Sequence, residues 1–321
     1  MPHDYSNYRT DGCLIEEVPS EAPTLKTENA GPLPERIDLR GMCSPVEDQG
    51  LIGSCAANAV VGALEYHQRL SGQAVTDLSR LYVYYNARKI GGTVNQDAGT
   101  FIHHVMASVL AFGACPERMW PYQQAMWATE PVSACYQAAE QFSAITYART
   151  DQGLGSKVAV ANGLPVVFGV SLPTQMLHVE APETGKIESP RGNWPAPSGG
   201  HAMLIVGYDE SRQSWLVRNS WGADWGPEGG HLWIPYDVMA HYSHPHAFWT
   251  IGAIDSHPTL GVSGPSQQQA LAAVQSQGPV QVSKALSHLK RDLGADLESS
   301  LEMAKRGIRN RLRGPGAGGG Y

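Results

Sequence analysis

The chain has 321 residues and a formal net charge of −7, with 42% hydrophobic and 17% charged residues. This composition suits a chain that buries a sizeable core, and the negative charge argues against a general nucleic-acid-binding protein. No run of 18 apolar residues occurs, so no membrane-spanning helix is expected. No apolar stretch follows a basic N-terminus either. We therefore expect a protein that is cytoplasmic, or exported without a recognisable signal peptide.

Five cysteines are spread widely, at Cys13, Cys43, Cys55, Cys115 and Cys135. Their number is odd and no CxxC pair occurs, which disfavours a zinc site or a thioredoxin-like site. The sequence leaves open a disulfide between Cys43 and Cys115, or between Cys115 and Cys135. Cys13 is interpreted as a spare thiol.

Composition divides the chain into five parts: 1–32, 33–255, 256–280, 281–313 and 314–321. The first is a polar, proline-bearing extension, and the second carries the dense apolar patterning of a folded domain. The third has the composition of a linker, and the last is a glycine-rich flexible tail. The fourth has leucines at helical spacing and many basic residues. It is predicted to form an amphipathic helix that lies on the domain or binds a partner or a membrane surface.

Within the main domain, helical patterns come first and strand patterns follow. Alanine-rich or periodic stretches predict helices, and short apolar runs between Gly-rich and Asp-rich turns predict strands. The predicted helices cover 55–70, 77–90 and 100–112, and the predicted strands cover 165–172, 201–209, 214–221 and 229–235. This order predicts an α+β fold with an N-terminal helical lobe and a C-terminal lobe made of an antiparallel sheet or barrel.

Cys55 stands where the first of these helices should begin. Unpaired backbone N–H groups and the positive end of the helix dipole would then lie near its sulfur, which predicts a lowered thiol pKa. Gly53 leaves room for a substrate to approach. Gln49 lies six residues before Cys55, and its amide together with the Cys55 N–H could form an oxyanion hole.

His201 opens one predicted strand, and Asn219 lies near the end of the next. Adjacent strands of a hairpin would bring the two side chains together, so that the Asn219 oxygen could orient the imidazole. Trp221 could cover that hydrogen bond and keep water away. A cysteine, a histidine and an orienting amide form the combination that nucleophilic acyl transfer requires.

Three segments carry a resemblance to a known family: QGLIGSC (49–55), GGHAMLIVGYD (199–209) and NSWGADWGPEGG (219–230). They resemble the signature regions of papain-like cysteine peptidases, family C1. LPERIDLR (33–40) is similar to the mature N-terminus of such enzymes. The stretch 78–100 is similar to the bacterial, xylellain-type branch. The resemblance implies the two-lobed papain-like fold with the active-site cleft between its lobes.

The resemblance also implies a cysteine-type endopeptidase that hydrolyses peptide bonds through a thioester acyl-enzyme, with no cofactor and no metal. Cys55 would be the nucleophile, His201 its proton partner, Asn219 the orienting residue and Gln49 the oxyanion donor. The implied substrate-binding residues are Gly53, Gly99, Gly169, Ala202 and Trp221. Among these, Gly169 and Ala202 would border the pocket for the second residue before the scissile bond.

The chain departs from the family pattern at three positions. Ile52 replaces a cysteine that usually forms a disulfide, Ala56 replaces an aromatic residue, and Gly200 replaces a polar one. We also expect this chain to lack the long inhibitory N-terminal domain of secreted family members, because few residues precede Leu33. We expect residues 1–32 to lie along the cleft instead and to hold the enzyme latent as a zymogen.

Other readings of the sequence stay open. The histidines of AHYSHPHAF, His241, His244 and His246, could suggest a metal site, but Pro245 and the irregular spacing favour a surface loop. A papain-like fold that only binds a partner, through the helix 281–313, is the alternative to an enzyme. A third possibility is transfer of the acyl group from a peptide or protein substrate to an amine instead of water.

Overall fold

The structure is a computed structural model. It describes residues 4–16, 24–25, 27, 32–70, 75–142 and 144–254. The linker, helix and tail predicted over 256–280, 281–313 and 314–321 lie outside the described residues. The described helices are α1 (Cys55–Leu70), α2 (Arg80–Ile90), α3 (Ile102–Phe112), α4 (Ser133–Ala139), α5 (Leu154–Ala161), α6 (Ala181–Thr184) and α7 (Tyr236–Tyr242). The strands are β1 (Arg36–Asp38), β2 (Ala144–Arg149), β3 (Val166–Val170), β4 (His201–Asp209), β5 (Ser214–Arg218), β6 (His231–Pro235) and β7 (Ser243–Ile254).

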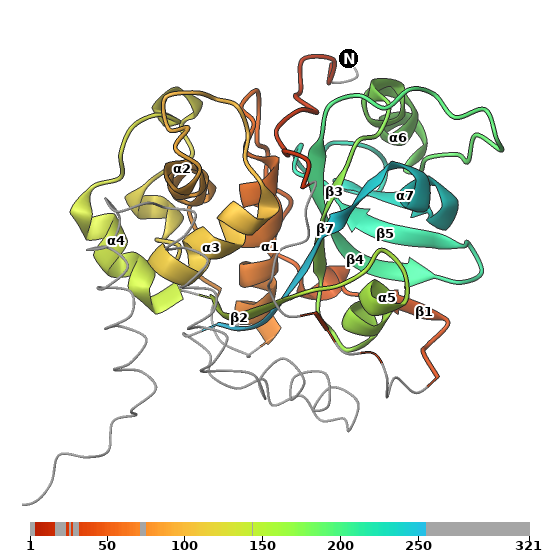
Figure 1. Ribbon diagram of the computed structural model, residues 1–321, viewed down its shortest axis with the longest axis horizontal. Coiled ribbons are helices and arrows are strands. Elements are labelled where there is room, and N and C mark those ends of the chain that lie inside the picture. The colour runs from red at the N-terminus through yellow and green to blue at the C-terminus, as the bar shows by residue number, and fades with distance from the viewer. Residues whose placement is uncertain are drawn as a thin grey trace, which may run out of the picture.

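Two lobes make up the molecule, with α2, α3 and α4 in one and most of the sheet in the other (Figure 1). Helix α1 stands between them, and it is buried on all sides from Cys55 to Gln68. Its alanines favour the helix and their small side chains let it pack closely against both neighbours. The predicted two-lobed α+β fold is thus confirmed.

The sheet is antiparallel and runs in the order β2-β7-β3-β4-β5-β6, with β1 added beside β4. Its path is open, with β2 and β6 at the two ends, so the barrel alternative is wrong and the sheet alternative is right. The central strand β4 is buried at all nine positions. Alternate side chains explain this, because Leu204 and Val206 join the core around α1 while Met203 and Ile205 join the core of the other lobe.

Two caps fix the ends of the helices that flank the site. The Ser79 side chain accepts a hydrogen bond from the Tyr82 N–H, and this bond caps the start of α2. Helix α3 ends at Gly113, whose φ of 68° suits glycine. Among the described residues, no helix is long and apolar enough to cross a membrane.

A buried ion pair joins α1 to α2. Arg80 Nη2 lies 2.9 Å from Glu65 Oε2, and both side chains are almost fully enclosed. Both groups have further hydrogen bonds, because Glu65 Oε1 accepts from the Leu78 N–H and Arg80 Nη1 donates to Asp77, while Arg80 Nε has no partner among the described residues. Removing Arg80 would leave the buried Glu65 carboxylate without its counterion.

We predict that Arg80→Met lowers the free energy of unfolding by about 3–5 kcal/mol, because the Glu65 carboxylate would stay buried and unpaired. Lys89→Met is the matched control, since Lys89 pairs with Glu130 at an exposed site. It should cost no more than about 1 kcal/mol. Denaturant unfolding measures both. Equal losses for the two variants would contradict the prediction.

Candidate active site

Cys55 is the first residue of α1 and has no exposed surface. The turn before it is tight, with a φ of 59° at Gly50. The Asn58 side chain donates to Ser54 and fixes the start of the helix. Across the lobe boundary, the Ala202 N–H donates to Cys55 Sγ at 3.4 Å. The sulfur therefore contacts the start of β4 at Ala202, the residue that follows His201.

His201 and Asn219 meet because of the register between β4 and β5. Leu204 pairs with Arg218, so continuing the register places His201 and Asn219 as diagonal neighbours on one face. The His201 Nε2 lies 2.8 Å from Asn219 Oδ1. An amide oxygen only accepts, so Nε2 carries the proton in the neutral ring. The other ring nitrogen, Nδ1, is buried and has no hydrogen-bond partner among the described residues.

Gln49 is fully buried beside this pair of elements. Its Oε1 accepts from the Ser220 hydroxyl at 2.6 Å, and its Nε2 donates to the Ile52 carbonyl at 3.0 Å. These two bonds hold the amide in one orientation, because the Ser220 hydroxyl can donate only to the oxygen and the Ile52 carbonyl can accept only from the nitrogen. One of the two N–H groups on Nε2 is still available to a further acceptor.

Burial keeps both reactive groups neutral in this state of the molecule. It raises the pKa of the Cys55 thiol to about 12, although the Ala202 and Ala56 N–H groups act in the opposite direction. It lowers the pKa of His201 to about 4, against the effect of the Asn219 hydrogen bond. The lowered thiol pKa predicted from the helix terminus is therefore wrong for the covered site, because loss of hydration outweighs the N–H groups.

The cover is the chain's own N-terminal segment, residues 4–16, which enters between the two lobes (Figure 1). Gly12 lies between two backbone segments of the helical lobe. A methyl group on Gly12 would lie 2.8 Å from the Gly53 oxygen, and one on Gly99 would lie 2.3 Å from the Gly12 oxygen. No side chain fits at either position, and a methyl group on Gly53 would lie 3.2 Å from the Gly99 Cα, so these three glycines allow the segment to pass beside Cys55.

Cys13 bonds to both lobes at once. Its N–H donates to the Gly200 carbonyl at 2.8 Å, and the flanking Gly12 carbonyl and Leu14 N–H bond to Thr100. The pairing between Cys13 and Thr100 is parallel. The Cys13 side chain is buried against Gly169. The segment is thus held as an extra strand between the lobes.

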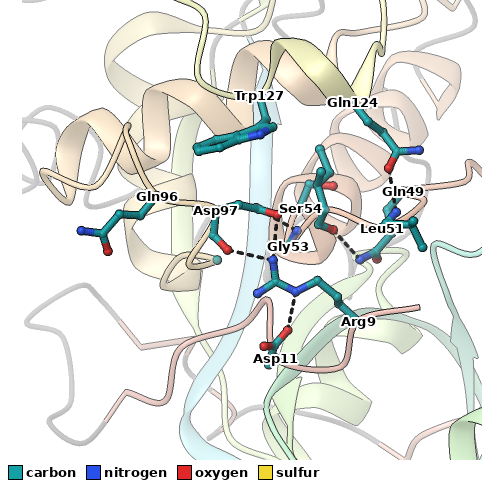
Figure 2. A network of polar contacts seen from close by, with 12 residues as sticks. Arg9, Asp11, Gln49, Leu51, Gly53, Ser54, Gln96, Asp97, Gln124 and Trp127 are labelled. Carbon is teal, nitrogen blue, oxygen red and sulfur yellow. Dashed lines mark hydrogen bonds and ion pairs between the residues drawn. The ribbon is translucent and has the colours of Figure 1, made fainter. Parts of the chain in front are cut away.

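A charged network fastens the segment to the helical lobe (Figure 2). Arg9 donates to the carboxylate and to the carbonyl of Asp97, at 2.7 and 2.8 Å, and also to Asp11. The other Asp97 oxygen accepts from the Gly53 N–H and the Tyr84 hydroxyl. Asp97 therefore shapes the loop before Cys55 and binds the segment that covers it.

Two tyrosines of the segment cover the indole of Trp221. The ring centroids of Tyr8 and Tyr5 lie 5.2 and 6.4 Å from that of Trp221. The indole in turn lies 5.3 Å from the His201 ring. The Tyr8 hydroxyl donates to Asp48 at 2.8 Å. Aromatic rings therefore shield the histidine from water in two layers.

The structure brings together the residues that the sequence singled out. Cys55, His201, Asn219 and Gln49 are all buried. Cys55 contacts the residue after His201, His201 contacts Asn219, and Gln49 contacts the residue after Asn219. Gly53 and Gly99 flank Gly12, Gly169 and its cross-strand partner Ala202 lie beside Cys13, and Trp221 contacts the tyrosines.

The sequence predicted that residues 1–32 lie along the cleft, but it did not identify Tyr8, Arg9 and Cys13 as the contacts, nor Asp48 as the acceptor for Tyr8. The only available signal was the aromatic and charged run YSNYRTDGC, which has no periodicity to interpret.

Two further expectations are decided here. The surface loop predicted around His244 is wrong, because this residue lies at the start of β7 and is buried. His241 in α7 is exposed, and no described group of three or more His, Cys, Asp or Glu could hold a metal.

All five cysteines are free thiols, so neither disulfide left open by the sequence is formed.

Comparison with known proteins agrees on the family. A family model described as papain family cysteine protease matches residues 33–243. An uncharacterized peptidase C1-like protein, L477 of Acanthamoeba polyphaga mimivirus, is 29% identical over 214 residues, which are 64% of this chain and 68% of that protein. Thiol protease aleurain of Arabidopsis thaliana is 31% identical over 61% of this chain, and the match spans 54% of aleurain.

The solved structures agree with this family and confirm the predicted papain-like fold. Xylellain, a cysteine protease from Xylella fastidiosa, superposes with a TM-score of 0.67 at 31% identity, over 75% of this chain and 95% of xylellain. Digestive procathepsin L 3 of Tenebrio molitor superposes with a TM-score of 0.59 at 20% identity, over 77% of each chain. The second likeness concerns the fold.

We predict that Gly12→Ala displaces the segment and exposes Cys55, because the added methyl group has no space at the Gly53 backbone. Alkylation of Cys55 near neutral pH, followed by peptide mass spectrometry, should accelerate by on the order of tenfold or more as the thiolate fraction rises. Gly41→Ala is the control, because a methyl group there meets nothing within 4 Å. An unchanged rate at Gly12→Ala would contradict the prediction.

Proposed function

Because the chain belongs to the papain family of cysteine proteases, we propose that it is an endopeptidase with Cys55 as nucleophile and His201 as proton partner. One observation supports this most directly. The Cys55 sulfur accepts from the Ala202 N–H, and the neighbouring His201 is oriented by Asn219, so both reactive groups are held in one enclosed place. Enclosed and pre-oriented groups are what nucleophilic catalysis requires.

The proposed reaction begins when the cleft opens and a peptide replaces the N-terminal segment. The Nδ1 lone pair of His201 takes the Cys55 proton, and the thiolate attacks the peptide carbonyl. The oxyanion accepts from the Cys55 N–H and from the available N–H of Gln49. His201 then gives its proton to the leaving amine as the C–N bond breaks, which leaves a thioester on Cys55.

Water completes the cycle. His201 accepts a proton from it as the oxygen attacks the thioester, and the thiol of Cys55 leaves with that proton. Asn219 keeps the imidazole in one tautomer throughout, and Trp221 keeps bulk water from their hydrogen bond. No oxidant, metal or cofactor takes part in these steps.

The full chain is proposed to be latent. The Gly12 carbonyl accepts from the Thr100 N–H, whereas the Gln49 Nε2 donates to the Ile52 carbonyl, and no described hydrogen bond joins Gly12 to Gln49. The segment fills the substrate path from Trp221 to Gly169 without offering a peptide bond to attack. Its release would require breaking the bonds of Arg9 to Asp97 and of Tyr8 to Asp48.

The first experiment separates an enzyme from a binding protein. The chain carrying Gly12→Ala is incubated with an epoxysuccinyl thiol-protease inhibitor and, separately, with a fluorogenic peptide. A covalent mass increase at Cys55 and peptide cleavage, both lost in Cys55→Ala, support the enzyme. A chain that binds peptides without either reaction is a binding protein. An amide product formed with an added amine in place of the free acid identifies acyl transfer.

We predict that Gln49→Ala lowers kcat by about 10²–10³-fold with little change in KM, because an oxyanion donor acts in the transition state. Gln96→Ala is the control, since Gln96 is exposed and points away from the site (Figure 2). Steady-state kinetics on one peptide measures both variants, each made in the chain that carries Gly12→Ala. A rise in KM with an unchanged kcat would contradict the assignment of Gln49 to the oxyanion hole.

A further inference from the structure

A histidine that the proposed chemistry does not use lies under the pocket that Cys13 fills. His244 is 6% exposed, at the start of β7. Its Nε2 lies 2.7 Å from the Ser171 hydroxyl, and that hydroxyl donates its single hydrogen to the Gly199 carbonyl at 2.5 Å. The Ser171 oxygen must therefore accept from His244, so Nε2 carries the proton.

The other nitrogen of this ring is then an acceptor. Burial lowers the pKa of His244 below its usual value, against the effect of Glu16, so the ring is neutral at pH 7. A neutral imidazole with a proton on Nε2 has a lone pair on Nδ1. That Nδ1 is buried and has no hydrogen-bond partner among the residues described.

The lone pair lies in the wall of the pocket. A methyl group placed on Gly169 would lie 3.2 Å from His244 Nδ1, 3.2 Å from Cys13 Sγ and 3.1 Å from Ala247 Cβ. One placed on Gly200 would lie 3.6 Å from His244 Cε1. The nitrogen, the thiol and the Ala247 methyl group thus border the same small space beside Gly169.

The present occupant leaves this acceptor unsatisfied. The Cys13 thiol donates to the Leu14 carbonyl at 3.7 Å. Glu16 Oε1 accepts from the His103 N–H, and Glu16 Oε2 is buried without a hydrogen-bond partner among the described residues, so no described bond joins Glu16 to His244. His244 Nδ1 is therefore a buried acceptor without a donor at the edge of the pocket, and burying it in that state costs free energy.

We propose that His244 makes this pocket selective for a small side chain that donates a hydrogen bond, such as threonine, over an apolar side chain of the same shape, such as valine. The inference deepens the proposed function, on which it rests. In a substrate, the side chain would be the second residue before the scissile bond, the position that family resemblance assigns to Gly169 and Ala202. The substrate class is thus peptides with a small hydroxyl residue there.

Size and polarity both contribute to this preference. Ala202, Ala247 and Gly169 leave room for a side chain near the size of cysteine. A site that supplies one hydrogen bond discriminates by the net value of that bond, which corresponds to about fivefold in affinity. His244 acts on binding and is not a catalytic residue in this account.

The first arm of the test uses the chain's own segment as the ligand and needs no peptidase activity. Cys13→Thr and Cys13→Val are made in the full chain, and hydrogen exchange of residues 8–16 is followed by mass spectrometry. We expect exchange of the Thr variant to be about fivefold slower than that of the Val variant. Equal rates, or faster exchange with Thr, would overturn the inference.

Two more variants assign the difference to the histidine. His244→Phe removes the acceptor and should abolish the Thr-to-Val difference. Ser171→Ala, which adds no bulk, frees the Nε2 proton and should reduce the difference. A difference that persists unchanged in a folded His244→Phe chain would assign the selectivity elsewhere and overturn the role of His244.

The second arm uses peptides that differ only in Thr or Val at the second position before the cleaved bond, with the chain carrying Gly12→Ala. We expect kcat/KM to favour Thr by about fivefold. Cleavage with no Thr preference, together with equal exchange rates, sinks the pocket inference and leaves the peptidase intact. A fivefold exchange difference with no cleavage of any peptide sinks the proposed function and leaves the pocket intact.

Discussion

The hydrogen bond from the Ala202 N–H to the Cys55 sulfur joins the first turn of a buried helix to the first residues of the central strand. This bond requires the N-terminus of α1 to contact the start of β4, and the other residues of the site lie around this contact. Antiparallel register supplies Asn219 beside His201, and the loop before the helix supplies Gln49. The small residues along the boundary leave a path just wide enough for an extended backbone.

Whether this path is occupied determines the charge state of Cys55 and His201. When the N-terminal segment occupies it, both the thiol and the imidazole lose their water, and each is held in its neutral form. The positive end of α1 does not compensate for this loss. In the proposed function, a thiolate–imidazolium pair would form only in the open cleft, where burial by a bound substrate would strengthen the hydrogen bonds of the site.

Much of this arrangement could be predicted from the sequence, because local patterns determine it. Helix α1 follows from a run of alanines, and β3, β4 and β5 follow from apolar runs between turns, so the group of Cys55, His201 and Asn219 could be anticipated. The sheet's open edge could not, since closure depends on pairing between distant strands. The burial of His244 and the position of Cys13 depend on tertiary contacts with Gly169 that leave no periodic trace in either segment.

The central claim is that Cys55 and His201 share a proton once the segment leaves the cleft. Thiolate absorbance in the ultraviolet, followed against pH, tests it directly in the full chain and in the chain carrying Gly12→Ala. The account predicts that Cys55 contributes no thiolate near pH 7 in the full chain. The opened chain should show one thiolate there, which His201→Ala abolishes. An opened chain without that thiolate, or with one that is indifferent to His201→Ala, would contradict the account.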